Sequence, residues 1–353
     1  MSGTLDSTHP VRPLHRKGED LLWMDLGGGR MVRGWGPFEK SETAPVEGWA
    51  FYVNDFDLGD PKPWLIPQDL DFECLGACTE RASPPARDWQ KPDPEQFRDV
   101  FEDIAGKLVR KSLRKAVPVV ADTCAWPEQT RWDFLEAFPH LEGDPGTHGY
   151  ACSMGTRGFA GRTPELLFHL EGGKLHTMAL AGTVPSGDRD TLQQHPKLLH
   201  EHELVVEVLL QRLGTLGSLT VLPRRLLDLG TMTHLCTKLE VTLDDPQWEQ
   251  RGGELIRLLH PTPALGIAPR NRQTLALLKS YRKTLKIPPH FGAPFGVKWP
   301  GGMLFLVAIR GIFWENEIAS LPAGCGIVSG SSFESEWAEL ELKRQWVRRA
   351  LGL

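Results

Sequence analysis

Residues 200–213 read HEHELVVEVLLQRL, a stretch that combines a helical apolar pattern with a charge on its apolar side. Val205, Leu209 and Leu213 recur at the i, i+4 spacing of an amphipathic helix, and Glu201 lies one turn earlier on the same face. The pattern predicts a helix over residues 197–213 whose buried face carries a carboxylate. A buried carboxylate requires a cation, a proton or several hydrogen bonds. Glu201 is therefore a candidate member of a binding or catalytic site.

Two histidines beside Glu201 raise the alternative of a zinc site. His200 and His202 stand at i and i+2, whereas the metal-binding HExxH pattern places its histidines at i and i+4 on one helical face. At i and i+2 the two rings point about 200° apart on a helix. The spacing therefore does not favour zinc.

The segments before this helix carry both strand and helix patterns. Apolar runs such as WAFYVNDF (49–56) indicate strands in the first part of the chain. The proline-rich stretch 83–94 then leads into a predicted helix that begins at Asp93-Pro94. Residues 115–121 (KAVPVVA) predict a strand in which Pro118 marks an edge or a bulge.

The segments around and after the helix complete the expected fold class. A Glu-Gly-Gly-Lys turn between two apolar runs predicts a hairpin over residues 166–183. GGMLFLVAIRG (301–311) predicts a buried strand that ends in Arg310, and an amphipathic helix begins near Phe333. Strands and helices are mixed without a regular βαβ order, so the pattern indicates α+β and not a doubly wound parallel sheet.

Composition excludes several classes of protein. The chain has 353 residues, of which 41% are hydrophobic and 24% charged, with a net charge of −5 and a pI near 6.2. These values are ordinary for a globular protein and do not indicate a nucleic-acid partner. We find no apolar run of membrane-spanning length and no signal-peptide pattern, so we expect a cytoplasmic protein without a membrane partner. The six scattered cysteines predict free thiols.

Polar side chains gather in the C-terminal segment SFESEWAELELKRQW (332–346). Glu336, Glu339, Lys343 and Trp346 share one helical face. Taken alone, this face is best explained as solvated, with an i, i+4 ion pair between Glu339 and Lys343. The preceding stretch AGCGIVSGSS (323–332) changes that interpretation, because a glycine-rich backbone exposes N–H groups that can hold an anion.

Two further stretches carry candidate site residues. In FAGRTPELLFHL (159–170), Glu165 follows a proline and precedes an apolar strand pattern. The stretch LLHPTPALGIAPR (258–270) combines proline, threonine, alanine and glycine, which predicts irregular, tightly packed backbone. At this length, such a segment is more often part of a site than a linker.

In this order the stretches resemble the chorismate-utilising enzymes, which include isochorismate, salicylate, anthranilate and aminodeoxychorismate synthases. The resemblance runs from about residue 105 to the C-terminus, and the matching motifs are RKAVPVV, FAGRTPELL, ALAGT, HEHELVV, THLCT, LLHPTPALG, AIRG, AGCGIV and ESEWAELELK. HEHELVV and LLHPTPAL are most similar to isochorismate synthases. The resemblance implies two layered, largely antiparallel sheets with flanking helices and an active site between the sheets. It also implies an N-terminal part of the sheet core over residues 1–95 and a catalytic region over 96–353 within one domain.

The resemblance assigns roles to individual positions. Lys115 matches the lysine that activates water for attack at ring carbon C2, and Glu165 matches the acid that protonates the departing C4 hydroxyl. Three carboxylates match ligands of Mg²⁺: Glu201, Glu336 and Glu339. The remaining matches are substrate-binding positions: Thr183, His234, Arg310, Gly324, Gly326 and Lys343. The implied substrate is chorismate, and we expect a monomer or a weak dimer.

Elementary electrostatics agrees with these roles. Chorismate is a dianion, so a pocket lined with carboxylates would repel it unless a cation reversed the local field. Mg²⁺ on oxygen ligands does so and keeps open positions for a substrate carboxylate. Burial lowers the pKa of a lysine and raises that of a glutamate, so one enclosed site can supply both a base and an acid.

Two positions and one stretch depart from the family pattern. The stretch from Glu165 to Glu201 is shorter than in siderophore-type relatives, which implies a missing surface loop. Leu198 stands where relatives usually have Asp or Asn, and we hypothesise that it desolvates the pocket. Ile267 stands where relatives usually have glycine, so the loop differs or the pocket is narrower, because a β-branched residue is poorly suited to a positive φ. Ala181 occupies the position of the lysine nucleophile of aminodeoxychorismate synthases, so covalent capture by lysine is not implied.

The sequence therefore predicts a Mg²⁺-dependent isochorismate synthase. Two alternatives remain: a salicylate synthase, which also eliminates pyruvate, and a non-catalytic member that binds chorismate. An amine-transferring synthase is disfavoured. The residues do not decide whether the product serves menaquinone, siderophore or salicylate biosynthesis.

Overall fold

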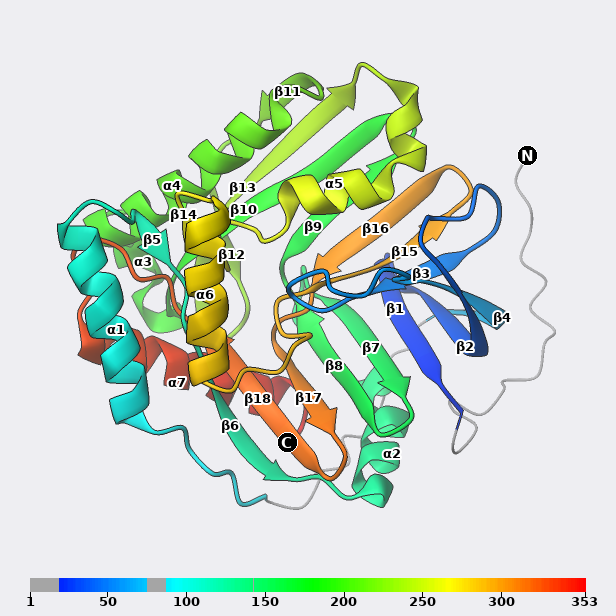
Figure 1. Ribbon diagram of the computed structural model, residues 1–353, viewed down its shortest axis with the longest axis horizontal. Coiled ribbons are helices and arrows are strands. Elements are labelled where there is room, and N and C mark those ends of the chain that lie inside the picture. The colour runs from blue at the N-terminus through cyan, green and yellow to red at the C-terminus, as the bar shows by residue number, and fades with distance from the viewer. Residues whose placement is uncertain (1–18, 75–86, 142) are drawn as a thin grey trace.

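The computed structural model describes residues 19–74, 87–141 and 143–353 (Figure 1). The first half of the chain supplies strands β1 to β8 and two helices: β1 (Leu21–Gly27), β2 (Arg30–Ser41), β3 (Ala50–Val53), β4 (Trp64–Cys74), α1 (Pro94–Val109), β5 (Lys115–Ala116), β6 (Val119–Ala125), α2 (Glu128–Ala137), β7 (His148–Met154) and β8 (Arg157–Thr163). The central part supplies a hairpin and the helices around it: β9 (Leu166–Glu171), β10 (Lys174–Pro185), α3 (Arg189–Leu192), α4 (Pro196–Leu213), β11 (Gly217–Val221), β12 (Arg225–Asp228), β13 (Met232–Leu243) and α5 (Gly252–Leu259). The remainder supplies β14 (Ile267–Ala268), α6 (Arg272–Thr284), β15 (Pro294–Trp299), β16 (Gly302–Val307), β17 (Gly311–Glu315), β18 (Ile318–Gly324) and α7 (Phe333–Ala350).

Sixteen strands form one hydrogen-bonded sheet, in the order β11-β13-β10-β9-β16-β15-β3-β4-β2-β1-β7-β8-β17-β18-β6, with β12 paired to β13. The pairings are antiparallel. The pairing of β15 with β3 therefore joins the strands from β11 to β15 in this order to those from β3 to β6. The expected α+β fold with largely antiparallel strands is confirmed, and the two layers are continuous in hydrogen bonding.

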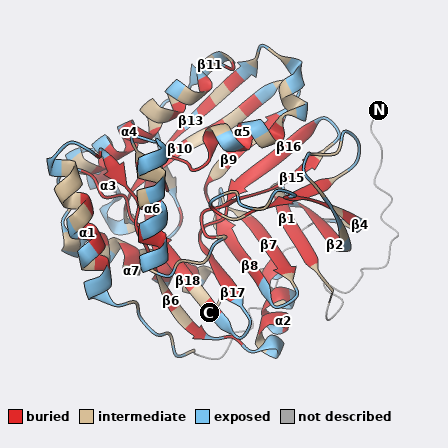
Figure 2. Cartoon of the chain, in the orientation of Figure 1, coloured by how far each residue is buried: buried red, intermediate tan, exposed pale blue. Residues whose placement is uncertain are grey.

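The hydrophobic core lies between the two halves of this path. One cluster combines buried residues from β1, β3 and β4 with residues from β9, β10, β13 and β16, and with the inner face of α4. Figure 2 shows that buried residues follow the strands, whereas α1 and α6 present exposed residues outward. A second cluster joins α1, α6 and α7 around the short β5–β14 pair. The helices thus cover the end of the sheet at which the candidate site residues lie.

Local sequence signals explain most element boundaries. Asp93 caps α1 by accepting a hydrogen bond from the Glu95 backbone N–H at 2.9 Å, as its position before Pro94 predicted. The predicted hairpin is present in β9 and β10, and its turn residues Gly172 and Gly173 both adopt positive φ, which suits a tight two-residue turn. The single strand predicted over 115–121 is wrong: Pro118 divides it into β5, which pairs with β14 in a separate sheet, and β6, which is an edge strand of the large sheet.

One predicted boundary is wrong. The buried strand in 301–311 ends at Val307, and Arg310 lies beyond it in the turn toward β17. Arg310 has a φ of +58°, which a regular strand does not allow. Because of this turn, the Arg310 side chain does not follow the alternation of side chains along β16.

Other expectations concern the chain as a whole. Cys124, Cys152, Cys236 and Cys325 are free and buried, while Cys78 lies outside the described residues. In the part of the chain that the structure describes, no helix has both the length and the apolar character needed to cross a bilayer.

Candidate active site

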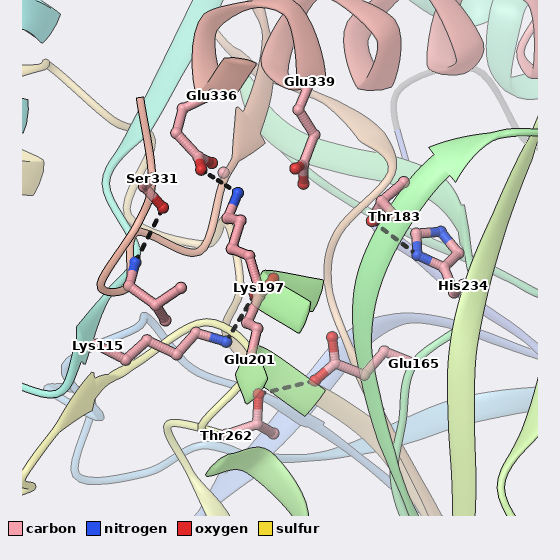
Figure 3. A network of polar contacts seen from close by, with 12 residues as sticks. Lys115, Glu165, Thr183, Lys197, Glu201, His234, Thr262, Ser331, Glu336 and Glu339 are labelled. Carbon is pink, nitrogen blue, oxygen red and sulfur yellow. Dashed lines mark hydrogen bonds and ion pairs between the residues drawn. The ribbon is translucent and has the colours of Figure 1, made fainter. Parts of the chain in front are cut away.

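A single pocket gathers most of the predicted site residues (Figure 3). Its lining includes nine of them: Glu165, Thr183, Glu201, His234, Arg310, Gly324, Gly326, Glu339 and Lys343. Lys115 and Glu336 are not in the lining, but Lys115 is bonded to Glu201 and Glu336 is bonded to Lys197. Residues far apart in the sequence, from Lys115 to Lys343, therefore meet between β10, β13, α4 and α7.

Glu201 is buried, as its helical position predicted, and its partner is a lysine. Lys115 Nζ donates to Glu201 Oε1 at 2.9 Å, with side-chain exposures of 1% and 8%. Burial acts to raise the pKa of Glu201, but the adjacent Lys115 ammonium outweighs it and the pKa is lowered. Glu201 is therefore an ionised carboxylate inside the protein.

The carboxylates of α7 are also paired with lysines. Lys197 of α4 forms a short ion pair with the fully buried Glu336. Lys343 Nζ lies 2.6 Å from Glu339 and donates to the Gly324 carbonyl at 2.8 Å. Burial, followed by the nearby charge of Glu339, raises the pKa of Glu336. Thus α4 and α7 bring three carboxylates to one end of the sheet (Figure 3), where lysines from β5, α4 and α7 pair with them.

Glu165 has a different environment from these carboxylates. It is 4% exposed, and it accepts a hydrogen bond at 2.7 Å from Thr262 Oγ1 in the proline-rich segment 258–270. Burial raises its pKa to about 7, against the opposing effects of the Thr262 hydrogen bond and of surrounding cations. The segment 258–270 is part of the site, as its composition predicted, because Ala264 and Leu265 also line the pocket.

Arg310 is held by its own turn and by two side chains. Its guanidinium donates to Met232 Sδ at 2.7 Å and to His234 Nε2 at 3.0 Å, and it stacks 5.0 Å from the Trp346 ring centroid. Burial lowers its pKa to about 10, so it stays charged at neutral pH. The pocket thus contains a fixed, desolvated cation that suits an anionic ligand.

The glycines of the predicted anion cradle act differently from one another. The Cys325 and Ile327 N–H groups already donate to Pro118 and Ala116 carbonyls, and Gly324 presents its carbonyl to Lys343. Gly326 is needed for space, because a Cβ there would lie 1.9 Å from Glu201 Oε1. Its contribution is close approach of the backbone to the carboxylate.

We expect Gly326→Ala to lower catalytic turnover by about 10²-fold, because the added methyl group displaces Glu201 and loosens its contact with Lys115. Steady-state kinetics on the purified variant measures this. Gly187→Ala is the matched control, because a Cβ at that exposed glycine meets no atom within 4 Å. Unchanged turnover in Gly326→Ala would show that the position of Glu201 is unimportant.

The two departures Leu198 and Ile267 have structural explanations. Leu198 is buried against Leu192 and Leu235, and its role in desolvating the pocket stays a prediction. Ile267 is in extended backbone, not at positive φ. It pairs with Ala116, while the next residue pairs with Lys115. Ile267 therefore belongs to the two-residue strand that holds the backbone of Lys115.

Sequence analysis did not single out Lys197 or Thr262. Lys197 precedes the apolar stripe of α4 by two turns, and only its short ion pair with Glu336 reveals its place in the site. Thr262 stood within a segment already expected to be irregular, but its contact with Glu165 joins residues 97 positions apart. The His202 ring is buried and forms a hydrogen bond with Thr237 Oγ1, whereas His200 is exposed. The two rings therefore point in different directions, as predicted.

Glu201, Glu336 and Glu339 are the candidate ligands of a metal ion. Among the residues that the structure describes, no group of three or more His, Cys, Asp and Glu side chains is close enough to hold a metal ion. The donor set nevertheless suits a hard cation, because all three candidate ligands are carboxylates and Glu339 raises the pKa of Glu336 by repulsion. A cation there would compete with the three lysines for the carboxylate oxygens.

Comparison of the sequence with known proteins identifies a family and several relatives. Residues 73–352 match the family model described as chorismate binding enzyme. The salicylate biosynthesis isochorismate synthase of Pseudomonas aeruginosa is 29% identical over 292 residues, covering 78% of this chain and 57% of that protein. The isochorismate synthase MenF of Escherichia coli is 30% identical over 228 residues, covering 58% and 48%. The chain thus spans about half the length of the curated relatives that it matches.

Solved structures show the same fold. The menaquinone-specific isochorismate synthase MenF from Escherichia coli aligns with a TM-score of 0.76 at 20% identity, covering 96% of this chain and 90% of that one. Anthranilate synthase component I from Streptococcus pneumoniae aligns with a TM-score of 0.64 at 14% identity, covering 99% and 95%. Because both kinds of synthase share the fold, the fold alone does not select the reaction.

Proposed function

The chain belongs to the chorismate-binding enzyme family, and from this premise we propose that it is an isochorismate synthase, which converts chorismate and water into isochorismate and water. The observation that carries the proposal is Glu165, whose pKa is raised to about 7 in a pocket that also contains Arg310 and Lys343. Such a carboxyl keeps its proton near neutral pH and can give it to a departing hydroxyl. The names of the curated relatives support the same reaction.

In the proposed reaction, the hydroxyl exchange needs one base and one acid. Lys115 takes a proton from water while the water oxygen bonds to ring carbon C2. Glu165 gives its proton to the hydroxyl that leaves C4 as the ring double bonds shift. One water enters and one leaves, so atoms and protons balance. An ammonium has no lone pair, so Lys115, which is paired with Glu201, must first lose a proton before it can accept one from water.

We propose that Glu201, Glu336 and Glu339 hold Mg²⁺, the hard cation that carboxylate oxygens favour. When bound, the ion would supply positive charge and open coordination positions for a substrate carboxylate. The chain's own contribution is to carry these carboxylates on α4 and α7 at one end of the sheet, with Glu201 kept ionised by Lys115. Their lysine partners set the affinity of the site, because each ammonium competes for the same oxygens.

The pocket disfavours the amine-transferring and covalent reactions of other relatives. Ala181 occupies the position at which a lysine nucleophile would stand, and it lines the pocket. Lys197, on the neighbouring helix α4, is engaged by Glu336. We therefore propose water as the incoming nucleophile.

The proposal predicts a specific product. Purified protein incubated with chorismate and Mg²⁺ should form isochorismate, and EDTA should abolish this activity; chromatography of the reaction mixture measures both. Salicylate with pyruvate would transfer the assignment to a salicylate synthase, and a product that requires ammonia would transfer it to an amine-transferring synthase. Unchanged chorismate, with binding retained in calorimetry, would identify a non-catalytic member.

A further inference from the structure

His234 lies between two groups that line the pocket, Thr183 and Arg310. Its Nδ1 is 2.9 Å from Thr183 Oγ1, and its Nε2 is 3.0 Å from Arg310 Nη2 (Figure 3 shows the first contact). The ring is 4% exposed, and both of its nitrogens are engaged within the protein. His234 therefore has no free ring nitrogen with which to hydrogen-bond a substrate.

The partners of His234 determine where its proton resides. A guanidinium carries donors only, so the hydrogen bond with Arg310 requires His234 Nε2 to accept. A proton on Nε2 would place two N–H groups against each other at 3.0 Å. The ring is neutral, because burial, with help from Arg310 and Lys343, lowers its pKa well below the ordinary value. A neutral ring with an accepting Nε2 carries its proton on Nδ1.

A proton on Nδ1 fixes the direction of the next hydrogen bond. Nδ1–H donates toward Thr183 Oγ1, so the Thr183 hydroxyl cannot give its own proton to His234. Among the described residues, Thr183 Oγ1 makes no other side-chain hydrogen bond. Thr183 lines the pocket, so its O–H can donate to a ligand there.

We propose that His234 is a positioning residue, whose Nδ1–H turns the Thr183 hydroxyl into a hydrogen-bond donor toward an oxygen of the substrate. Arg310 keeps N–H groups beyond those that it gives to Met232 and His234, because a guanidinium has five. Two donors of fixed direction select an oxygen acceptor and reject a group that can only donate. The choice of chorismate as the probe rests on the proposed function, whereas the assignment of the proton does not.

Nitrogen NMR of the free protein tests the proton position without any substrate. In ¹⁵N-histidine-labelled protein, the resonances lost in His234→Gln identify His234. We expect Nδ1 to be protonated and Nε2 to be unprotonated at neutral pH. A ring protonated on Nε2, or on both nitrogens, would overturn the proposal.

A double-mutant cycle tests whether His234 acts through Thr183. In a Glu165→Gln background, in which turnover is expected to be about 10²- to 10⁴-fold slower, calorimetry measures chorismate affinity. We expect Thr183→Val to weaken binding about ten- to a hundredfold and Thr183→Ser to keep it within about threefold, because serine retains the hydroxyl. His234→Gln should weaken binding alone but add less than about threefold to Thr183→Val.

The outcomes separate the two proposals. Additive losses in the cycle, or full affinity in Thr183→Val, would overturn the role of His234 and leave the proposed reaction intact. If unsubstituted protein neither binds nor converts chorismate, the proposed function fails, and the NMR result still decides the proton position. Unchanged melting temperatures in the variants show that affinity, and not folding, has been measured.

Discussion

Glu165→Gln is expected to reduce chorismate turnover by about 10²- to 10⁴-fold, the usual contribution of a general acid. The amide keeps the shape of the carboxyl and its contact with Thr262, but it has no proton to give to the leaving hydroxyl. The protein should therefore fold and bind chorismate while turning it over slowly. Product chromatography measures the loss, and the exposed Glu171→Gln on the neighbouring hairpin is the matched control.

The same substitution should change the pH dependence. The pKa of Glu165 is raised to about 7 from an ordinary value of 4.5, so the folded protein keeps a proton that the unfolded chain has lost between these values. Its contribution to stability is full below pH 4.5 and is lost as the pH rises through 7. Turnover should fall over the upper part of this range, because the acid form disappears. Glu165→Gln should remove this component of the stability profile; an unaltered profile would contradict the assignment.

Lys115→Gln is expected to abolish turnover and also to destabilise the fold by about 3–5 kcal/mol. The second effect arises because Glu201 would remain buried without its partner at 2.9 Å. Denaturant unfolding measures the stability loss, and Lys238→Gln on the exposed face of β13 is the control for a lysine without this role. Few single substitutions in this chain should have a comparable effect on both quantities.

A second substitution separates catalysis from stability. Glu201→Gln in the Lys115→Gln background removes the unpaired charge, so most of the lost stability should return. Turnover should not return, because the base is still absent. Recovery of turnover in the double variant would show that Lys115 serves only as the counter-ion of Glu201.

The sequence predicted elements whose signals are local. The apolar pattern of α4 predicted that Glu201 lies on a buried face, because helical periodicity depends on neighbouring residues in the sequence. The proline before α1 and the Gly-Gly turn between β9 and β10 likewise depend on short-range backbone preferences. These signals were sufficient for the fold class and for the face on which the site lies.

The contacts that complete the site are long-range, and local patterns do not encode them. The pair Lys115–Glu201 joins residues 86 positions apart, and Lys197–Glu336 joins residues 139 apart. The end of β16 was placed too late because apolar composition continues past Val307 while the backbone turns. The pairing of Ile267 with Ala116 was also invisible, since a two-residue strand has no periodicity.

The order of strands in the sheet has a consequence for synthesis of the protein on the ribosome. β8 ends at Thr163, but β17, which pairs with it, begins at Gly311, and β18, which pairs with β6, begins at Ile318. At ordinary elongation rates the growing chain would expose these edges for on the order of 10 s. Unpaired edges invite association with other chains. We therefore expect the nascent protein to depend on chaperones until α7, which carries Glu336 and Glu339, has emerged.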